Sequence, residues 1–246
     1  MFENDLPKRK IGVLSPLSVI DNGAYEFYRL VSDRIMLVMI PVGLAEFSGK
    51  DVERVFAPID SYLDKLVERR VDIVVQSGVP LPALIGVEAH DRLVAHIADY
   101  AKRPATSSVL GVVAAAKDLG LKEIAFANKW SEAMNRTLGE FFARDQIAVA
   151  GVASKVLAPS QFQKMSGGDN IELAYELGRQ ALNDFPQADG LYIGGGAWLS
   201  QPVAEALEAE FKKPVITNVS AMIRNVLKLT GCWTPIPGHG RVLGLN

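Results

Sequence analysis

The sequence has 246 residues, of which 49% are hydrophobic, so it is long enough for one large or two small domains with substantial cores. Its formal net charge of −2 gives no sign of the dense basic surface that binds nucleic acid. No apolar run reaches the ~20 residues that cross a bilayer, and the start of the chain, with Glu3 and Asp5, has no apolar core, which predicts no export signal.

The first hundred residues alternate short β-branched runs with segments of helical periodicity, which is typical of parallel strands joined by crossover helices. Apolar residues recur at helical spacing from Asp51 to Arg70 and again near Glu88–Ala101, where Pro104 ends the helix. The predicted strands are 10–14, 34–40 and 72–78.

The same pattern then repeats. Segment 123–129 parallels 10–16, and segment 190–196 parallels 72–78. Between them we predict a helix over 131–145 with Ser131 as its N-cap, a strand over 147–154 and a helix over 171–183. Ser200 is a candidate cap for a further helix, and a last helix near 221–230 ends at Gly231. The repetition predicts a duplicated α/β unit.

Four turns follow predicted strands and carry the candidate ligand-binding residues. Parallel sheets bind ligands beyond the carboxyl ends of their strands, so two facing halves would bring these turns to one cleft. The turns are Ser15-Pro16-Leu17, Ser77-Gly78-Val79-Pro80, Asn128-Lys129-Trp130 and Gly194-Gly195-Gly196.

The glycine run matches none of the common site motifs. The sequence around it lacks GxGxxG and GxxxxGK[ST], which argues against a nucleotide, and GxSxG, which argues against a serine hydrolase. A carboxylate can bind without any of these motifs, because the backbone N–H groups of Gly195 and Gly196 at a helix N-terminus would hold it.

Cysteine and histidine are scarce. The single Cys232 excludes an internal disulfide and fits a cytoplasmic protein. Three scattered histidines give no metal-binding cluster, so we expect no metal and no cofactor. His239, in a glycine-flanked turn, is more typical of a structural role in the tail than of catalysis.

Several segments together carry a resemblance to a known family. They are "IGVLSP", "DIVVQSG", "LGLKEIAFANKWSEAMN", "DGLYIGGGAWLS", "KPVITNVSAMIRNVLKLTG" and "PIPGHGRVL", spread from Lys10 to Leu245. The chain resembles the Asp/Glu racemase superfamily, and in particular its arylmalonate decarboxylase and maleate isomerase branch.

The resemblance implies an α/β fold of two three-layer halves related by a pseudo-twofold axis. Each half has a parallel sheet of about four strands, and the site lies in the cleft between the halves. We expect residues 1–107 with 220–246 to form the first half and residues 108–219 to form the second.

The family's two cysteine positions fall on Gly78 and Gly195, which are both glycine here. Racemisation by paired thiols, and thiol addition to an alkene, are therefore excluded if this match holds. The family's hydroxyl donors after the first position fall on Val79 and Pro80, and its mid-chain tyrosine falls on Trp130. These changes imply a more apolar site.

The predicted function is a cysteine-independent lyase of the decarboxylase type, or an isomerase-like enzyme, acting on a small carboxylic acid, with an aromatic acid as one option. The alternative is a non-catalytic protein that binds a small acid as a pathway accessory. Lys129 is the candidate catalytic residue, and Cys232 matches neither family cysteine. The candidate binding residues are Ser15, Pro16, Leu17, Ser77, Gly78, Val79, Trp130, Gly195, Gly196 and Asn218. The expected partner is this small acid, with neither nucleic acid nor membrane, and a homo-oligomer is compatible with the sequence.

Overall fold

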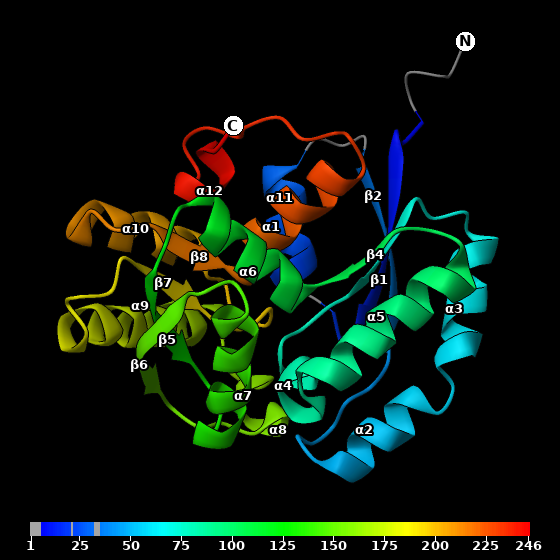
Figure 1. Ribbon diagram of the computed structural model, residues 1–246, viewed down its shortest axis with the longest axis horizontal. Coiled ribbons are helices and arrows are strands. Elements are labelled where there is room, and N and C mark those ends of the chain that lie inside the picture. Colours follow the sequence, from blue (N-terminus) through cyan, green and yellow to red (C-terminus); the bar gives the residue numbers. More distant parts are fainter. Residues whose placement is uncertain (1–5, 21, 32–34) are drawn as a thin grey trace.

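The computed structural model describes residues 6–20, 22–31 and 35–246, and it contains two separate four-stranded parallel sheets. The strand orders are β2-β1-β3-β4 and β6-β5-β7-β8, so each strand of the first sheet has a counterpart at the same place in the second. Figure 1 shows the two sheets side by side, each covered by its own helices. The predicted duplication and fold class are confirmed.

The first half is a three-layer arrangement. One face of its sheet packs on α1 and α11, through Phe27 and Ile223, and the other face packs on α3 and α5, through Leu66 and Ile97. Because both faces are covered, the central strand β1 is a continuous buried apolar run rather than an alternating one. The strands are β1 (Arg9–Ser15), β2 (Ile35–Pro41), β3 (Ile73–Gln76) and β4 (Ala105–Ser107); the helices are α1 (Asn22–Leu30), α2 (Gly49–Phe56), α3 (Ile59–Glu68), α4 (Pro80–Ile85) and α5 (Val87–Ala101).

The second half repeats this plan. Phe126 and Tyr192 pack against α6 and α7 on one face of the sheet, and Ala127 and Leu191 pack against α9 and α10 on the other. The strands are β5 (Glu123–Asn128), β6 (Ala148–Ser154), β7 (Gly190–Ile193) and β8 (Val215–Thr217). The remaining helices in chain order are α6 (Ser108–Asp118), α7 (Glu132–Ala143), α8 (Pro159–Phe162), α9 (Gly167–Asp184), α10 (Gln201–Phe211), α11 (Asn218–Leu229) and α12 (Arg241–Gly244).

Helices α6 and α11 join the halves. They lie against each other, and Figure 1 shows both at the centre of the molecule. Helix α6 follows β4 of the first sheet yet packs on the second, whereas α11 follows β8 of the second sheet and packs on the first. This exchange gives the halves one continuous interface. The exact domain boundaries stay a prediction.

Two predicted elements differ from the structure. The helix expected over Asp51–Arg70 is divided into α2 and α3, because Pro58 lacks the N–H that a continuous helix needs and instead caps α3. Ser200 precedes α10 as predicted, but its side chain makes no capping hydrogen bond. Arg34, the first residue of the second predicted strand, and the amino-terminal Glu3 and Asp5 lie outside the described residues.

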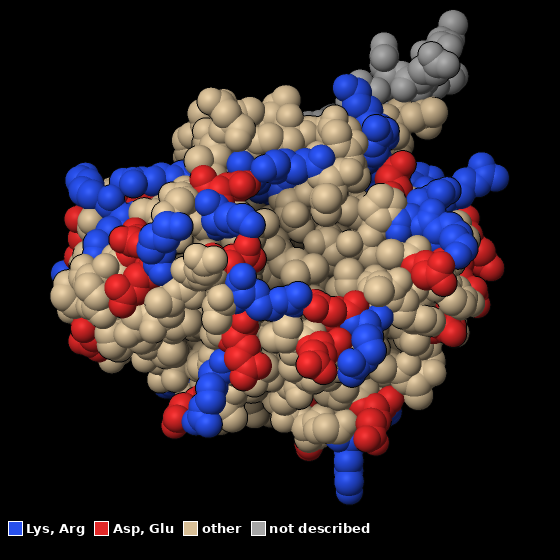
Figure 2. Space-filling view, viewed as in Figure 1, with Lys and Arg blue, Asp and Glu red and all other residues tan. Residues whose placement is uncertain are grey.

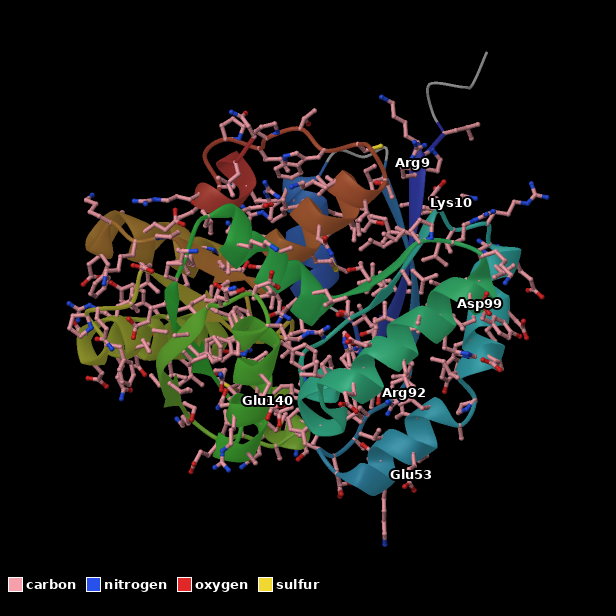
Figure 3. All side chains as sticks on the ribbon, in the orientation of Figure 1. Arg9, Lys10, Glu53, Arg92, Asp99 and Glu140 are labelled. Atoms are coloured by element: carbon pink, nitrogen blue, oxygen red, sulfur yellow. The ribbon has the colours of Figure 1, made fainter. Side chains whose placement is uncertain are left out.

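Charged residues gather on the outside. On the face in Figure 2, acidic and basic side chains are interspersed around an uncharged centre. Figure 3 shows Glu53, Arg92, Asp99 and Glu140 pointing outward from their helices, and all four are exposed. Within the described residues, no helix is both long enough and apolar enough to cross a membrane. The same part of the chain has no cluster of three or more metal-binding side chains.

Candidate functional site

A cavity of about 100 Å³ lies between the two halves, at the carboxyl ends of β1, β3, β5 and β7. Its wall is mostly apolar, and Lys129 is the only described lining residue with an amine or carboxyl group. The four turns singled out in the sequence all contribute to this wall.

The structure brings together Lys129 and all but one of the ten predicted binding residues. The exception is Val79, which is fully buried where the two halves meet. It belongs to the same hydrophobic cluster as Ala83 and Trp130. The remaining lining residues are Pro80, from the second candidate turn, and Val13, Val19, Ile20, Gly23, Leu37, Met39, Phe47, Ser108, Phe162, Ala197, Trp198, Val219 and Met222.

Gly78 and Gly195 have backbone conformations that favour glycine. Their φ angles are +84° and +131°, a region that residues with a Cβ rarely adopt. A Cβ on Gly78 would lie 2.5 Å from Cγ of Pro16, and one on Gly195 would lie 2.8 Å from Nε1 of Trp198. Both positions are therefore closed to a side chain by geometry and by their neighbours.

Lys129 is held in place by the turn that follows β5. The main-chain oxygen of Lys129 accepts a hydrogen bond from the N–H of Leu157 at 3.1 Å. The next N–H, that of Trp130, donates to Oδ1 of Asn128 at 3.0 Å, and Asn128 is itself paired with Asn135. The side chain of Lys129 thus starts from a fixed point at the cavity wall.

The amine of Lys129 is buried among aromatic rings. The residue is only 3% exposed, and Nζ lies 4.1 Å from the ring centroid of Trp198 and 4.6 Å from that of Phe162. Nζ has no hydrogen-bond partner among the described residues. Because burial disfavours the charged form, the pKa of Lys129 is lowered from 10.5 to about 7. The amine is free to engage a ligand.

Other polar groups surround the cavity. The indole Nε1 of Trp198 is a second buried donor without a partner among the described residues. Oδ1 of Asn218 accepts from the hydroxyl of Tyr192 at 2.5 Å and from the N–H of Gly195 at 3.1 Å, which leaves the amide nitrogen as the donor. Ser108 and Asn218 are the first residues of α6 and α11, so two helix N-termini border the cavity and favour negative charge there.

Phe47 and Phe162 form an aromatic contact between the halves. Their rings are stacked, with centroids 6.3 Å apart. Phe47 and Lys129 also line an outer groove of about 710 Å³, so they separate that groove from the inner cavity. Phe162 is the last residue of the short helix α8, which begins at Pro159.

Two residues weighed in the sequence lie elsewhere. Cys232 does not line the cavity, and it packs with Trp233 at the core of the first half. The carbonyl of His239 accepts from the side chain of Gln201 at 2.7 Å, and its ring lies 3.2 Å from Glu205, so it ties the tail to α10.

The family model described as arylmalonate decarboxylase matches residues 26–243 of this chain. The chain belongs to the arylmalonate decarboxylase family. The family resemblance drawn from the sequence is thereby confirmed. The arylmalonate decarboxylase of Bordetella bronchiseptica is 21% identical over 202 residues, which are 82% of this chain and 83% of the relative.

Solved structures of this family and of maleate isomerase share the fold. A variant of arylmalonate decarboxylase in a liganded form, with a glycine changed to cysteine and a cysteine to serine, has a TM-score of 0.84 and 19% identity, over 96% of this chain and 98% of its own. A maleate cis-trans isomerase variant of Nocardia farcinica, with a covalently bound succinylcysteine intermediate, has a TM-score of 0.84 and 16% identity, over 97% and 99%. At such identities the likeness concerns the fold.

Proposed function

We propose that this member of the arylmalonate decarboxylase family is a cysteine-independent decarboxylase acting on a small carboxylic acid with an apolar substituent. The observation that carries the proposal is the amine of Lys129, which is buried without a partner among the described residues, in a cavity whose other described lining residues are uncharged. A buried cation is costly unless a partner of opposite charge joins it, so this group favours an acidic ligand.

The cavity provides donors for a carboxylate and contacts for an apolar group. Nζ of Lys129, Nε1 of Trp198 and the amide of Asn218 are available to carboxylate oxygens. Leu37, Met39 and other apolar walls surround the remaining space. A volume of about 100 Å³ is smaller than the ~150 Å³ that admits benzene in an engineered cavity. This favours a short aliphatic acid over the aromatic one considered from the sequence.

Decarboxylation needs groups that stabilise a developing negative charge, and this site has such groups. The bond to the leaving carboxylate breaks, CO2 departs, and the electron pair remains as an enolate or enediolate. The N-termini of α6 and α11, together with Lys129, lie where they would stabilise that negative charge in a dry site. Isomerisation by thiol addition has less support, because no cysteine lines the described cavity.

The test is CO2 release from a panel of short malonic and 3-oxo acids. We expect turnover with at least one acid, and a loss of about 10²–10³-fold in K129M, since a preorganised donor at the developing negative charge contributes that much. Lys155 is exposed and follows β6 near the site, so K155M is the matched control and retains activity. Equal rates in wild type and K129M would contradict the proposal.

The binding alternative has one observation in its favour, which is that glycine conformation and packing close both positions 78 and 195 to a thiol. For a binding protein, calorimetry would detect a short acid bound at micromolar concentration, lost in K129M, while no acid in the panel releases CO2.

A further inference from the structure

The amine of Lys129 has surroundings that differ from those of an ordinary carboxylate-binding lysine. No described residue of the cavity wall carries an acid, and Glu46, the one acidic residue among the described residues that line the outer groove, is exposed. Nζ lies over the aromatic rings of Trp198 and Phe162. Within the described part of the chain, therefore, no counter-ion keeps the amine protonated and no wall residue donates a hydrogen bond to its lone pair.

We propose that Lys129 is a covalent nucleophile, whose amine forms an imine with the ketone carbonyl of a short 3-oxo carboxylic acid. This deepens the proposed function and rests on it, since it names the substrate class of the same decarboxylation. A 3-oxo acid with one methyl group, 3-oxobutanoate, is the smallest simple ketone of this class and suits the cavity.

The steps balance without an oxidant, a reductant or a metal. The neutral nitrogen of Lys129 adds to the ketone carbon, and uptake of one proton with loss of one water gives an iminium ion. The bond between the α-carbon and the carboxylate then breaks, CO2 leaves, and the electron pair forms an enamine that neutralises the nitrogen. The α-carbon takes a proton from solvent, water adds to the iminium carbon, and the ketone and the free amine separate with release of one proton. One 3-oxo acid anion and one proton become one ketone and CO2.

The protonation state suits this chemistry. An unperturbed lysine, with a pKa near 10.4, is neutral in only about 1 molecule in 2500 at pH 7. The pKa of Lys129 is lowered to about 7 by burial, so roughly half of the amines are neutral and nucleophilic at that pH. A lysine that served only to hold a carboxylate by its charge would gain from the opposite shift.

The neighbouring donors have roles in the same reaction. The unpartnered Nε1 of Trp198 and the amide of Asn218 are placed to hold the substrate carboxylate or the carbonyl oxygen during attack. The short acid and the released water both have to fit within the cavity, which favours small substituents at both ends of the substrate.

Reductive trapping tests the proposal. Wild type and the K155R control are incubated with 3-oxobutanoate and sodium borohydride, digested and analysed by mass spectrometry. We expect N-isopropyl-lysine, the reduced adduct of the decarboxylated iminium, at Lys129 in both proteins and no such adduct in K129R. The ketone product should also exchange its oxygen with ¹⁸O-labelled water in a Lys129-dependent manner.

K129R separates covalent from purely electrostatic roles. Its guanidinium keeps a positive charge but cannot form the imine, so we expect CO2 release from 3-oxobutanoate to fall by about 10³-fold or more. Release of CO2 from 3-oxobutanoate without any trapped adduct, or K129R with more than about a tenth of wild-type activity, would overturn the covalent step while leaving the decarboxylase proposal standing. An adduct at Lys129 without CO2 from any acid would support the imine and refute decarboxylation.

Discussion

Replacing Lys129 by methionine should stabilise the folded protein at neutral pH. Methionine has a similar length, so it fills the same space with little repacking. The pKa of Lys129 falls from 10.5 to about 7 on folding, which corresponds to about 5 kcal/mol of destabilisation at low pH. The contacts of Nζ with the rings of Trp198 and Phe162 offset roughly 2 kcal/mol of this cost. The expected net gain in K129M is about 3 kcal/mol.

The stability advantage of K129M over wild type should decrease as the pH rises. Between pH 7 and 10.5, the unfolded chain binds a proton at Lys129 that the folded protein has released. Wild-type stability therefore rises with pH in this window, by at most about 1.4 kcal/mol per pH unit from this group. K129M lacks this contribution, so its advantage is full below pH 7 and disappears toward pH 10.5.

Urea and thermal unfolding of wild type, K129M and K155M at several pH values between 6 and 10 measure the effect. At pH 7 the melting temperature of K129M should be higher by roughly 6–12 °C for a chain of this size, while CO2 release is lost. A K129M protein that is no more stable than wild type at pH 6–7, or whose advantage is independent of pH, would refute the reasoning that a buried amine without a partner destabilises the fold.

Four further outcomes are expected. G195C should lose about 2–4 kcal/mol in urea unfolding, because its Cβ meets Trp198 at a φ of +131°; wild-type stability would contradict the backbone assignment. W198F removes a buried donor that has no partner among the described residues, but it also leaves a cavity in place of a fully buried indole, so stability should fall by about 1 kcal/mol while KM for the acid increases about tenfold; an unchanged KM would remove Nε1 from the site. Glu26 caps α10 by accepting from the N–H of Gln201, and burial raises its pKa to about 7. Since the folded protein holds a proton that the unfolded chain has lost between pH 4.5 and 7, E26Q should be more stable by about 3 kcal/mol above pH 7 and equal below pH 4.5, as unfolding curves will show. Alkylation of Cys232, which lies outside the cavity wall, should leave CO2 release unchanged, and inactivation would place the thiol in the mechanism.

The fold was predictable because its signals are local and repeated. Strands β1 and β5 are buried on both faces, so each is a short apolar run with turn residues directly after it. Since ligand sites in parallel sheets lie at the carboxyl ends of strands, the positions of Ser15, Gly78 and Lys129 in the cavity followed from chain order alone.

The remaining features depend on contacts between distant parts of the chain. Ser200 has the right residue type and position for a cap, yet Glu26, from a helix in the other half, accepts the hydrogen bond from Gln201. Phe162 lies in a short helix and stacks on Phe47 of the first half. The loop that carries Trp198 is held by Asn22 of the first half, whose side chain donates to the carbonyl of Ala197. No periodicity indicates which of several aromatic residues turns toward a cavity.

The glycine run after β7 has one explanation from the likeness to relatives and another from the backbone geometry. A likeness to relatives predicts that Gly195 stands where a thiol is expected, and the backbone supplies an independent reason for glycine through its φ of +131°. The indole of Trp198 occupies the space where a side chain at position 195 would begin, and the same indole lies against the amine of Lys129. A thiol at this site would therefore require both a different backbone and a different position for Trp198. This chain therefore differs from a thiol-bearing relative by more than one sulfur atom. The indole of Trp198 forms this part of the cavity wall, and the amine in contact with it belongs to Lys129, in the turn after β5.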